Sequence, residues 1–114
     1  MAANAGLSVI SLRYHALIAR REDRLDRRSA EVPSRDLWGW TPLEEAATAT
    51  LRACTVASEA HTVLNLVASE TLSTTPSAQL AARHYPDVPF REPLRGSAAF
   101  YDSGRARELL DWAG

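Results

Sequence analysis

The chain has 114 residues, a net charge of −1, 46% hydrophobic residues and 24% charged residues. This balance is typical of a single soluble domain over residues 1–114, and it excludes a strongly basic nucleic-acid binder. All thirteen basic residues are arginine, and the single cysteine, Cys54, excludes an internal disulfide and fits a reducing, cytoplasmic compartment. No apolar run approaches the roughly 20 residues of a membrane span.

The first predicted element is a buried strand over residues 7–13, where leucine, valine and isoleucine form a nearly continuous apolar run. Such a run is typical of a parallel strand covered on both faces, so we expect it to need neighbouring strands. Residues 20–28 mix five arginines with three acids. They predict either an anion-binding patch or a solvated helix or loop, and the interleaved charges favour the second. Residues 1–6 and 29–36 are predicted to be flexible.

The clearest helix start is at Thr41. Its hydroxyl can cap the first free N–H groups, Pro42 suits the first helical position, and Glu44 can complete a capping box. The predicted helix runs to about Ser58. Its apolar residues recur at helical spacing and predict one core-facing side, on which the cysteine is a small core residue. These residues are Leu43, Ala47, Leu51 and Cys54.

The rest of the chain alternates in the same way. Residues 61–68 predict a second strand, and a helix follows from Thr74 or Thr75 to His84. Residues 87–94 contain prolines and predict an extended, edge-type strand. A last helix begins at Asp102 or Ser103, with Trp112 packed just after it. The predicted fold class is therefore a small α/β domain with two to three short strands and three to four helices.

An ordered series of motifs accompanies these elements. It comprises residues 12–20 (LRYHALIAR), 38–47 (WGWTPLEEAA), 61–65 (HTVLN), 80–89 (LAARHYPDVP) and 100–112 (FYDSGRARELLDW). Together they resemble the C-terminal, substrate-side part of the extended short-chain dehydrogenases/reductases, the NAD-dependent epimerase/dehydratase family. The resemblance covers about nine-tenths of the chain and implies the C-terminal part of a Rossmann-type fold.

The chain departs from the family pattern at several places. Ala16 stands at the family's asparagine, and Ala19-Arg20 replaces a Gly-Pro pair. Pro42 replaces the first aspartate of the second motif, and Asp111 replaces a glycine in the last one. The loss of the asparagine and of the Gly-Pro pair puts a polar substrate contact in that loop in doubt.

The resemblance implies a set of site residues. In the family the loop after the first strand passes the nicotinamide and the substrate. Tyr14 and His15 would therefore face the cofactor, NAD or NADP. Substrate-facing positions, for a small carbonyl or sugar compound, would be Ala16, Trp38, Trp40 and Thr41. The two tryptophans could instead bind a partner or simply pack in the interior, and simple packing is favoured.

The parts of the family that carry out catalysis are missing from this sequence. A phosphate-binding loop needs three closely spaced glycines, whereas the five glycines here are scattered. The family also uses a tyrosine with a lysine four residues later, and the cationic lysine lowers the tyrosine pKa. This chain has no lysine, and arginine places its donors differently. We therefore assign no catalytic residue. The three histidines lack metal-ligand spacing, so no metal site is predicted.

Two functions remain open from the sequence. The chain could be the substrate-side segment of an NAD(P)-dependent epimerase, dehydratase or reductase, inactive alone, either truncated or paired with a nucleotide-binding partner chain. Alternatively, it could be a non-catalytic interaction module, a pseudoenzyme or subunit, that pairs through the strand at residues 7–12 with a partner or as a homodimer. Neither hypothesis involves nucleic acid or a membrane.

Overall fold

The computed structural model describes residues 7–20, 37–56 and 61–114. Within them lie four short strands and three helices, so the α/β fold class is confirmed with one strand more than the sequence predicted. The elements are β1 (Val9–Tyr14), β2 (Ala16–Ile18), β3 (Trp40–Pro42), α1 (Leu43–Ala53), β4 (His61–Leu66), α2 (Ser77–His84) and α3 (Gly104–Leu110). The segments predicted to be flexible, 1–6 and 29–36, and nearly all of the charged stretch at 20–28 lie outside the described residues.

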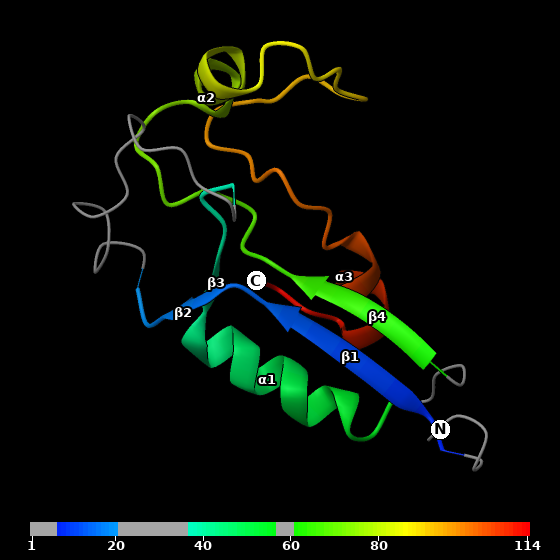
Figure 1. Cartoon of the computed structure of the whole chain (residues 1–114). Coiled ribbons are helices and arrows are strands. Elements are labelled where there is room, and N and C mark those ends of the chain that lie inside the picture. Colours follow the sequence, from blue (N-terminus) through cyan, green and yellow to red (C-terminus); the bar gives the residue numbers. More distant parts are fainter. Residues whose placement is uncertain (1–6, 21–36, 57–60) are drawn as a thin grey trace.

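The strands form two parallel pairs. β1 pairs with β4 from Val9 opposite His61 to Tyr14 opposite Leu66, and α1 lies on the crossover between them (Figure 1). β2 pairs with β3 just beyond the carboxyl end of β1. The predicted strand at 61–68 is confirmed as β4. β2 and β3 were not predicted, because three residues are too few to show an alternating pattern.

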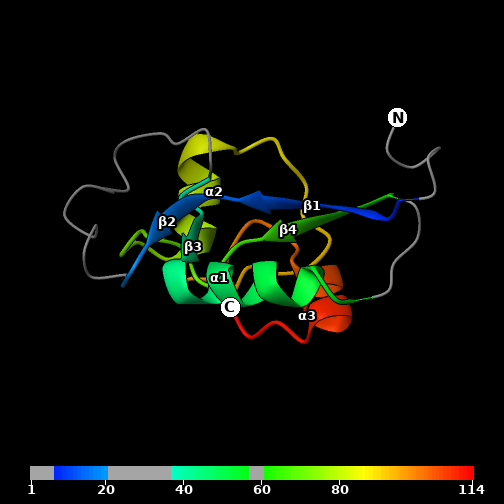
Figure 2. The same ribbon diagram turned by 90° about the horizontal axis from the view of Figure 1, so that it is seen from below.

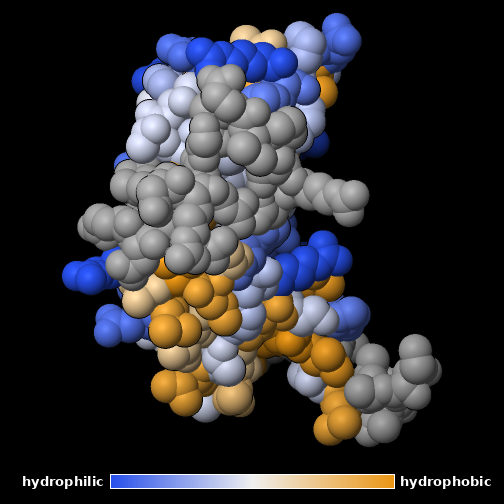
Figure 3. All heavy atoms as spheres, turned by 60° about the vertical axis from the view of Figure 1, so that its left-hand side comes forward, coloured by the Kyte–Doolittle hydropathy of each residue, from blue (hydrophilic) through white to orange (hydrophobic). Residues whose placement is uncertain are grey.

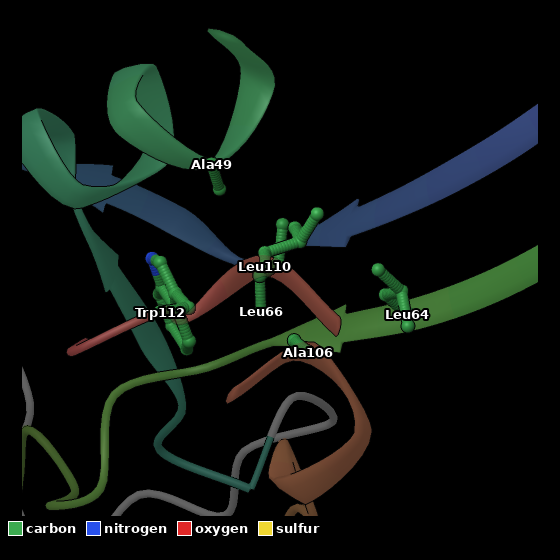
Figure 4. Close-up of a cluster of buried hydrophobic side chains, with 6 residues drawn as sticks. All are labelled: Ala49, Leu64, Leu66, Ala106, Leu110 and Trp112. Carbon is green, nitrogen blue, oxygen red and sulfur yellow. The ribbon is translucent and has the colours of Figure 1, made fainter. Parts of the chain in front are cut away.

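The main core lies on one face of the β1–β4 pair. α1 and α3 both lie on this face, as Figure 2 shows from below. Alternate strand residues point toward them because side chains in a strand alternate between the two faces. The buried cluster, drawn in Figure 4, comprises Ala49, Leu64, Leu66, Ala106, Leu110 and Trp112. Ile10, Leu12 and Tyr14 of β1 pack against it but are only partly buried.

Trp112 closes this core after α3, as the sequence predicted. The residue is 3% exposed, and its indole N–H donates a hydrogen bond of 3.0 Å to the backbone oxygen of Glu45 on α1. Asp111, at the end of α3, has φ of 51°, in the left-handed region. This conformation turns the chain back toward the sheet and places the tryptophan on it.

The start of α1 differs from the prediction. Thr41 does not cap the helix. It lies in β3, Pro42 occupies the cap position, and no side chain caps the first turn. The Thr41 side chain is fully buried, and its hydroxyl bonds between the strands instead. A tertiary contact between strands has therefore replaced the local capping bond.

The predicted core face of α1 is also wrong. Leu43 and Leu51 are 48% and 73% exposed, and Cys54 is exposed as well. The residues that pack into the interior are Ala46 and Ala49. Their small side chains bring the helix close to the sheet, so α1 turns its larger apolar residues away from the core of this chain.

Two further predictions require correction. β1 was expected to be buried on both faces, but none of its six residues is fully buried. Residues 87–94 form no strand, which is consistent with prolines that cannot donate to a ladder. The other two helices were predicted correctly. α2 begins after Pro76, and at α3 the Asp102 carboxylate accepts the N–H of Gly104 at 2.8 Å.

Candidate functional site

The carboxyl ends of β1 and β4 meet at one end of the sheet, where parallel α/β folds bind ligands. His15 follows β1 directly, and Val67 follows β4. Ser103, just before α3, donates to the backbone oxygen of Val67 at 3.1 Å and accepts its N–H at 3.0 Å. These two hydrogen bonds to one residue hold the segment before α3 across the end of the sheet.

Thr41 positions the loop after β1. The backbone N–H of His15 donates to its hydroxyl oxygen at 3.0 Å, and that hydroxyl donates to the backbone oxygen of Leu66 at 2.5 Å. One buried side chain thus joins the ends of β1 and β4 through β3. Buried hydroxyls with both bonding capacities used in this way fix backbone positions closely.

The His15 imidazole lies against the ring of Tyr101. Their centroids are 4.3 Å apart with an angle of 53° between the planes, and both side chains are half-buried. Tyr101 also lines a surface groove of about 420 Å³. The other lining residues are Phe90, Arg91, Glu92, Pro93, Leu94, Ala98, Ala99, Phe100 and Asp102. The carboxyl end of β1 therefore brings a histidine next to a tyrosine. The same tyrosine lines a groove with aromatic and charged side chains.

Sequence reasoning placed His15 at this site but missed Tyr101. The tyrosine lies 86 positions further along the chain, and only the fold brings its ring to the histidine. Its motif, Tyr-Asp-Ser before the last helix, could not place it, because the position of Tyr101 depends on the bond from Ser103 to the end of β4.

Tyr14, predicted to face the cofactor, points toward α1. Its hydroxyl donates to the backbone oxygen of Ala46 at 3.3 Å and makes a second, short hydrogen bond with Thr50. Ala16, predicted to face the substrate, is half-buried in β2 opposite Trp40. In this structure the Tyr14 hydroxyl holds the helix on the sheet.

The two tryptophans of the predicted substrate loop are packing residues here. Trp38 is fully buried, with its ring 5.4 Å from that of His84 and 5.8 Å from that of Phe100, centroid to centroid. Trp40 is 8% exposed and donates its indole N–H to the backbone oxygen of Glu70 at 2.9 Å. Both tryptophans thus hold neighbouring segments together, as expected if they serve as packing residues.

The start of α1 does not suit the phosphates of a dinucleotide. Helix N-termini bind phosphate through free N–H groups and the positive end of the helix dipole. The first turn of α1 instead carries Glu44 and Glu45, which repel an anion. The glycines are also too scattered to form a phosphate-binding loop. The start of α1 therefore offers no favourable site for these phosphates.

Over the ranges 7–20, 37–56 and 61–114, no three His, Cys, Asp or Glu side chains gather as a metal site would require. None of the helices in those ranges is long and apolar enough to cross a membrane.

Comparison with known proteins gives no match to a family model, to a curated protein or to a solved structure. The family resemblance therefore stays a prediction from the ordered series of motifs.

Proposed function

We propose that this chain is the substrate-side part of an NAD(P)-dependent epimerase, dehydratase or reductase and that it acts with a nucleotide-binding part carried elsewhere. The observation that supports this most is the contact between His15 and Tyr101 at the carboxyl ends of two parallel strands. This is the end of an α/β sheet at which substrates bind.

The groups at that end suit a small polar substrate. An imidazole can donate and accept hydrogen bonds, and a phenol can do both as well. The aromatic side chains of the neighbouring groove offer apolar surface. Arg91 can donate to carbonyl and hydroxyl oxygens, while Glu92 and Asp102 can accept from hydroxyl groups. Thr41 holds the His15 backbone, so this wall keeps its shape before a substrate arrives.

The redox and proton-transfer steps are assigned to the other part. The chain has no lysine to lower the pKa of a tyrosine, and the acidic first turn of α1 is unsuited to a pyrophosphate. Its own residues would bind and orient the substrate and exclude water from it. Alone, the chain is expected to bind neither NADH nor NADPH and to turn over no carbonyl compound.

The DNA that flanks the coding region provides the first test. A reading frame there that encodes a glycine-rich loop and a Tyr-x-x-x-Lys motif would supply the missing part. Co-expression of both parts should give consumption of NADH or NADPH with carbonyl substrates, and His15→Ala should raise KM more than it lowers kcat.

The purified chain provides the second test. Titration with NADH and NADPH, followed by nucleotide fluorescence, should show no saturable binding. Tight binding by the chain alone, or turnover of any carbonyl compound by it, would contradict the proposed division of labour. Leu109→Ala, which truncates a partly buried residue of α3 that packs against the main core, is the control for the His15 variant in the co-expressed enzyme.

A further inference from the structure

The outer side of β1 carries apolar surface that this chain does not cover. Within the described residues β1 has one strand partner, β4, so its other edge has unpaired backbone groups. Beside this edge, a groove of about 300 Å³ runs between β1 and α1, lined among others by Ile10, Leu12 and Val56. We call this edge, together with the α1 residues Leu43, Ala47, Thr50, Leu51 and Cys54, the open side.

The α1 part of the open side is a continuous stripe. Its members recur at positions i, i+4, i+7, i+8 and i+11, which share one face of a helix. Thr50 and Cys54 line the groove next to β1, while the opposite flank of α1 faces α3, where Arg52 donates to the backbone oxygen of Leu110 at 3.0 Å. Figure 3 shows apolar residues gathered over the part of the surface formed by β1 and α1. An amphipathic pattern of this kind normally faces a core, yet none of the described elements covers this stripe.

The other face of the β1–β4 pair limits what the covering element is. By strand alternation this face carries Val9, Ser11, Arg13, His61, Val63 and Asn65, and the Ser11 hydroxyl lies 2.9 Å from His61 Nε2. Four of these six residues are polar, as in sheets that leave one face in water. The occupant therefore has to cover the edge and the α1 side, and it does not need helices on both faces.

We propose that, in the chain without its nucleotide-binding part, a second copy of this chain occupies the open side. Two β1 strands pair antiparallel about a two-fold axis, which gives the strand order β4-β1-β1-β4, and the two α1 stripes contact each other on the helical side of the sheet. The pairing uses the same surface on both copies, as two-fold symmetry requires. It also satisfies the free backbone groups of an edge that would otherwise invite aggregation.

The pattern of β1 selects the register. With Ser11 opposite Ser11 of the second copy, each Ile10 lies opposite a Leu12 on the helical side, which is a favourable cross-strand apolar pair. Each Arg13 then lies opposite a Val9 on the polar face. The two arginines are separated by four residues, about 13 Å along the strand, which exceeds the screening length near physiological salt. A parallel pairing in register would place them side by side, so charge favours the antiparallel arrangement.

The size of the open side predicts a weak dimer. The strand edge is about 20 Å long and the adjoining α1 is about 10 Å across, so the flat surface measures on the order of 200 Å². A standard stable interface buries about 800 Å² on each partner. The two copies are therefore expected to exchange and to dissociate on dilution.

Native mass measured by light scattering over a wide range of concentrations tests the association. We expect a concentration-dependent monomer–dimer equilibrium, and Leu51→Glu should weaken it at least about tenfold because it buries a charge at the contact. Leu51 is 73% exposed in the monomer, so the variant should still fold. Val88→Glu, at an apolar residue that is 50% exposed but lies away from the open side, is the matched control and should dimerise like the parent.

A disulfide reporter tests the register. In a Cys54→Ser background, Ser11→Cys should give a covalently linked dimer on mild oxidation, because directly opposed residues in an antiparallel pair lie within disulfide reach. Asn65→Cys is the control, since the two β4 strands would be about 14 Å apart. A chain that stays monomeric at every concentration, a dimer that Leu51→Glu leaves intact, or crosslinking at residue 65 equal to that at residue 11 would each overturn the proposal. None of these results depends on cofactor binding, so failure here is distinct from failure of the proposed function.

Discussion

The two strands of the main sheet have similar apolar patterns but very different surroundings. On β4, Leu64 and Leu66 are completely buried beneath α3 and Trp112, which form the closed side of the sheet. On β1, Ile10 and Leu12 point toward the same core but remain partly exposed on the open side. Burial of a strand is therefore set by which elements pack beside it, and among the described residues those elements lie on one side only.

The largest expected effect comes from the centre of the closed side. Leu66→Ala should lower the free energy of unfolding by about 3 kcal/mol, because it removes a fully buried side chain and leaves a cavity. Leu12→Ala should cost clearly less, since its side chain is already partly in water. Urea unfolding of both variants in dilute solution measures the comparison, and equal losses would show that the open side is buried in the monomer.

Thr41→Val probes the link between the two strands. The substitution leaves the His15 N–H and the Leu66 backbone oxygen without a partner at a buried position, which should cost about 2 kcal/mol. Thr41→Ser keeps the hydroxyl and should recover most of the loss. If the serine variant is as unstable as the valine variant in urea unfolding, the missing methyl group and not the hydrogen bonds would be the cause.

A smaller effect is expected where Trp112 attaches the end of the chain to α1. Trp112→Phe keeps an aromatic ring in the core but removes the hydrogen bond to the Glu45 backbone oxygen, at a cost of about 1 kcal/mol. Thermal unfolding followed by circular dichroism measures this loss. A stability equal to that of the parent would mean that the packing of the ring alone closes this side.

The smallest effect should be on the open side itself. Leu51→Gln replaces an exposed leucine on a helix with a residue of comparable helix propensity, so the dilute monomer should change by no more than about 0.5 kcal/mol. Urea unfolding at low and at high chain concentration separates monomer from dimer. A large loss in the dilute monomer would show that the leucine is buried within a single chain.

The sequence predicted the elements better than their faces. β4, α2 and α3 follow from local apolar runs and helix starts, which depend on neighbours in the chain. The face of α1 could not be predicted correctly, because Leu43, Ala47, Leu51 and Cys54 outweigh Ala46 and Ala49 in hydrophobicity while the smaller residues fit the close approach to the sheet. Periodicity identifies an apolar stripe but does not say which molecule covers it.

The candidate site was predicted in part for a similar reason. His15 was expected near a ligand only because the family resemblance implies that the loop after the first strand passes the cofactor and the substrate. Tyr101 could not be placed, since its position depends on the bonds that Ser103 makes to Val67. Thr41 was predicted in a local role, as a helix cap, whereas its bonds reach two strands that are distant in sequence.

The central claim is that the β4 side of this chain is closed and the β1 side is open. Carbene footprinting of the dilute monomer, with mass spectrometry to locate the label, tests it most directly. We predict strong labelling of Ile10 and Leu12 on β1 and of Leu43 and Leu51 on α1, with almost none on Leu64 and Leu66. Labelling of β1 no stronger than that of β4 would contradict the account.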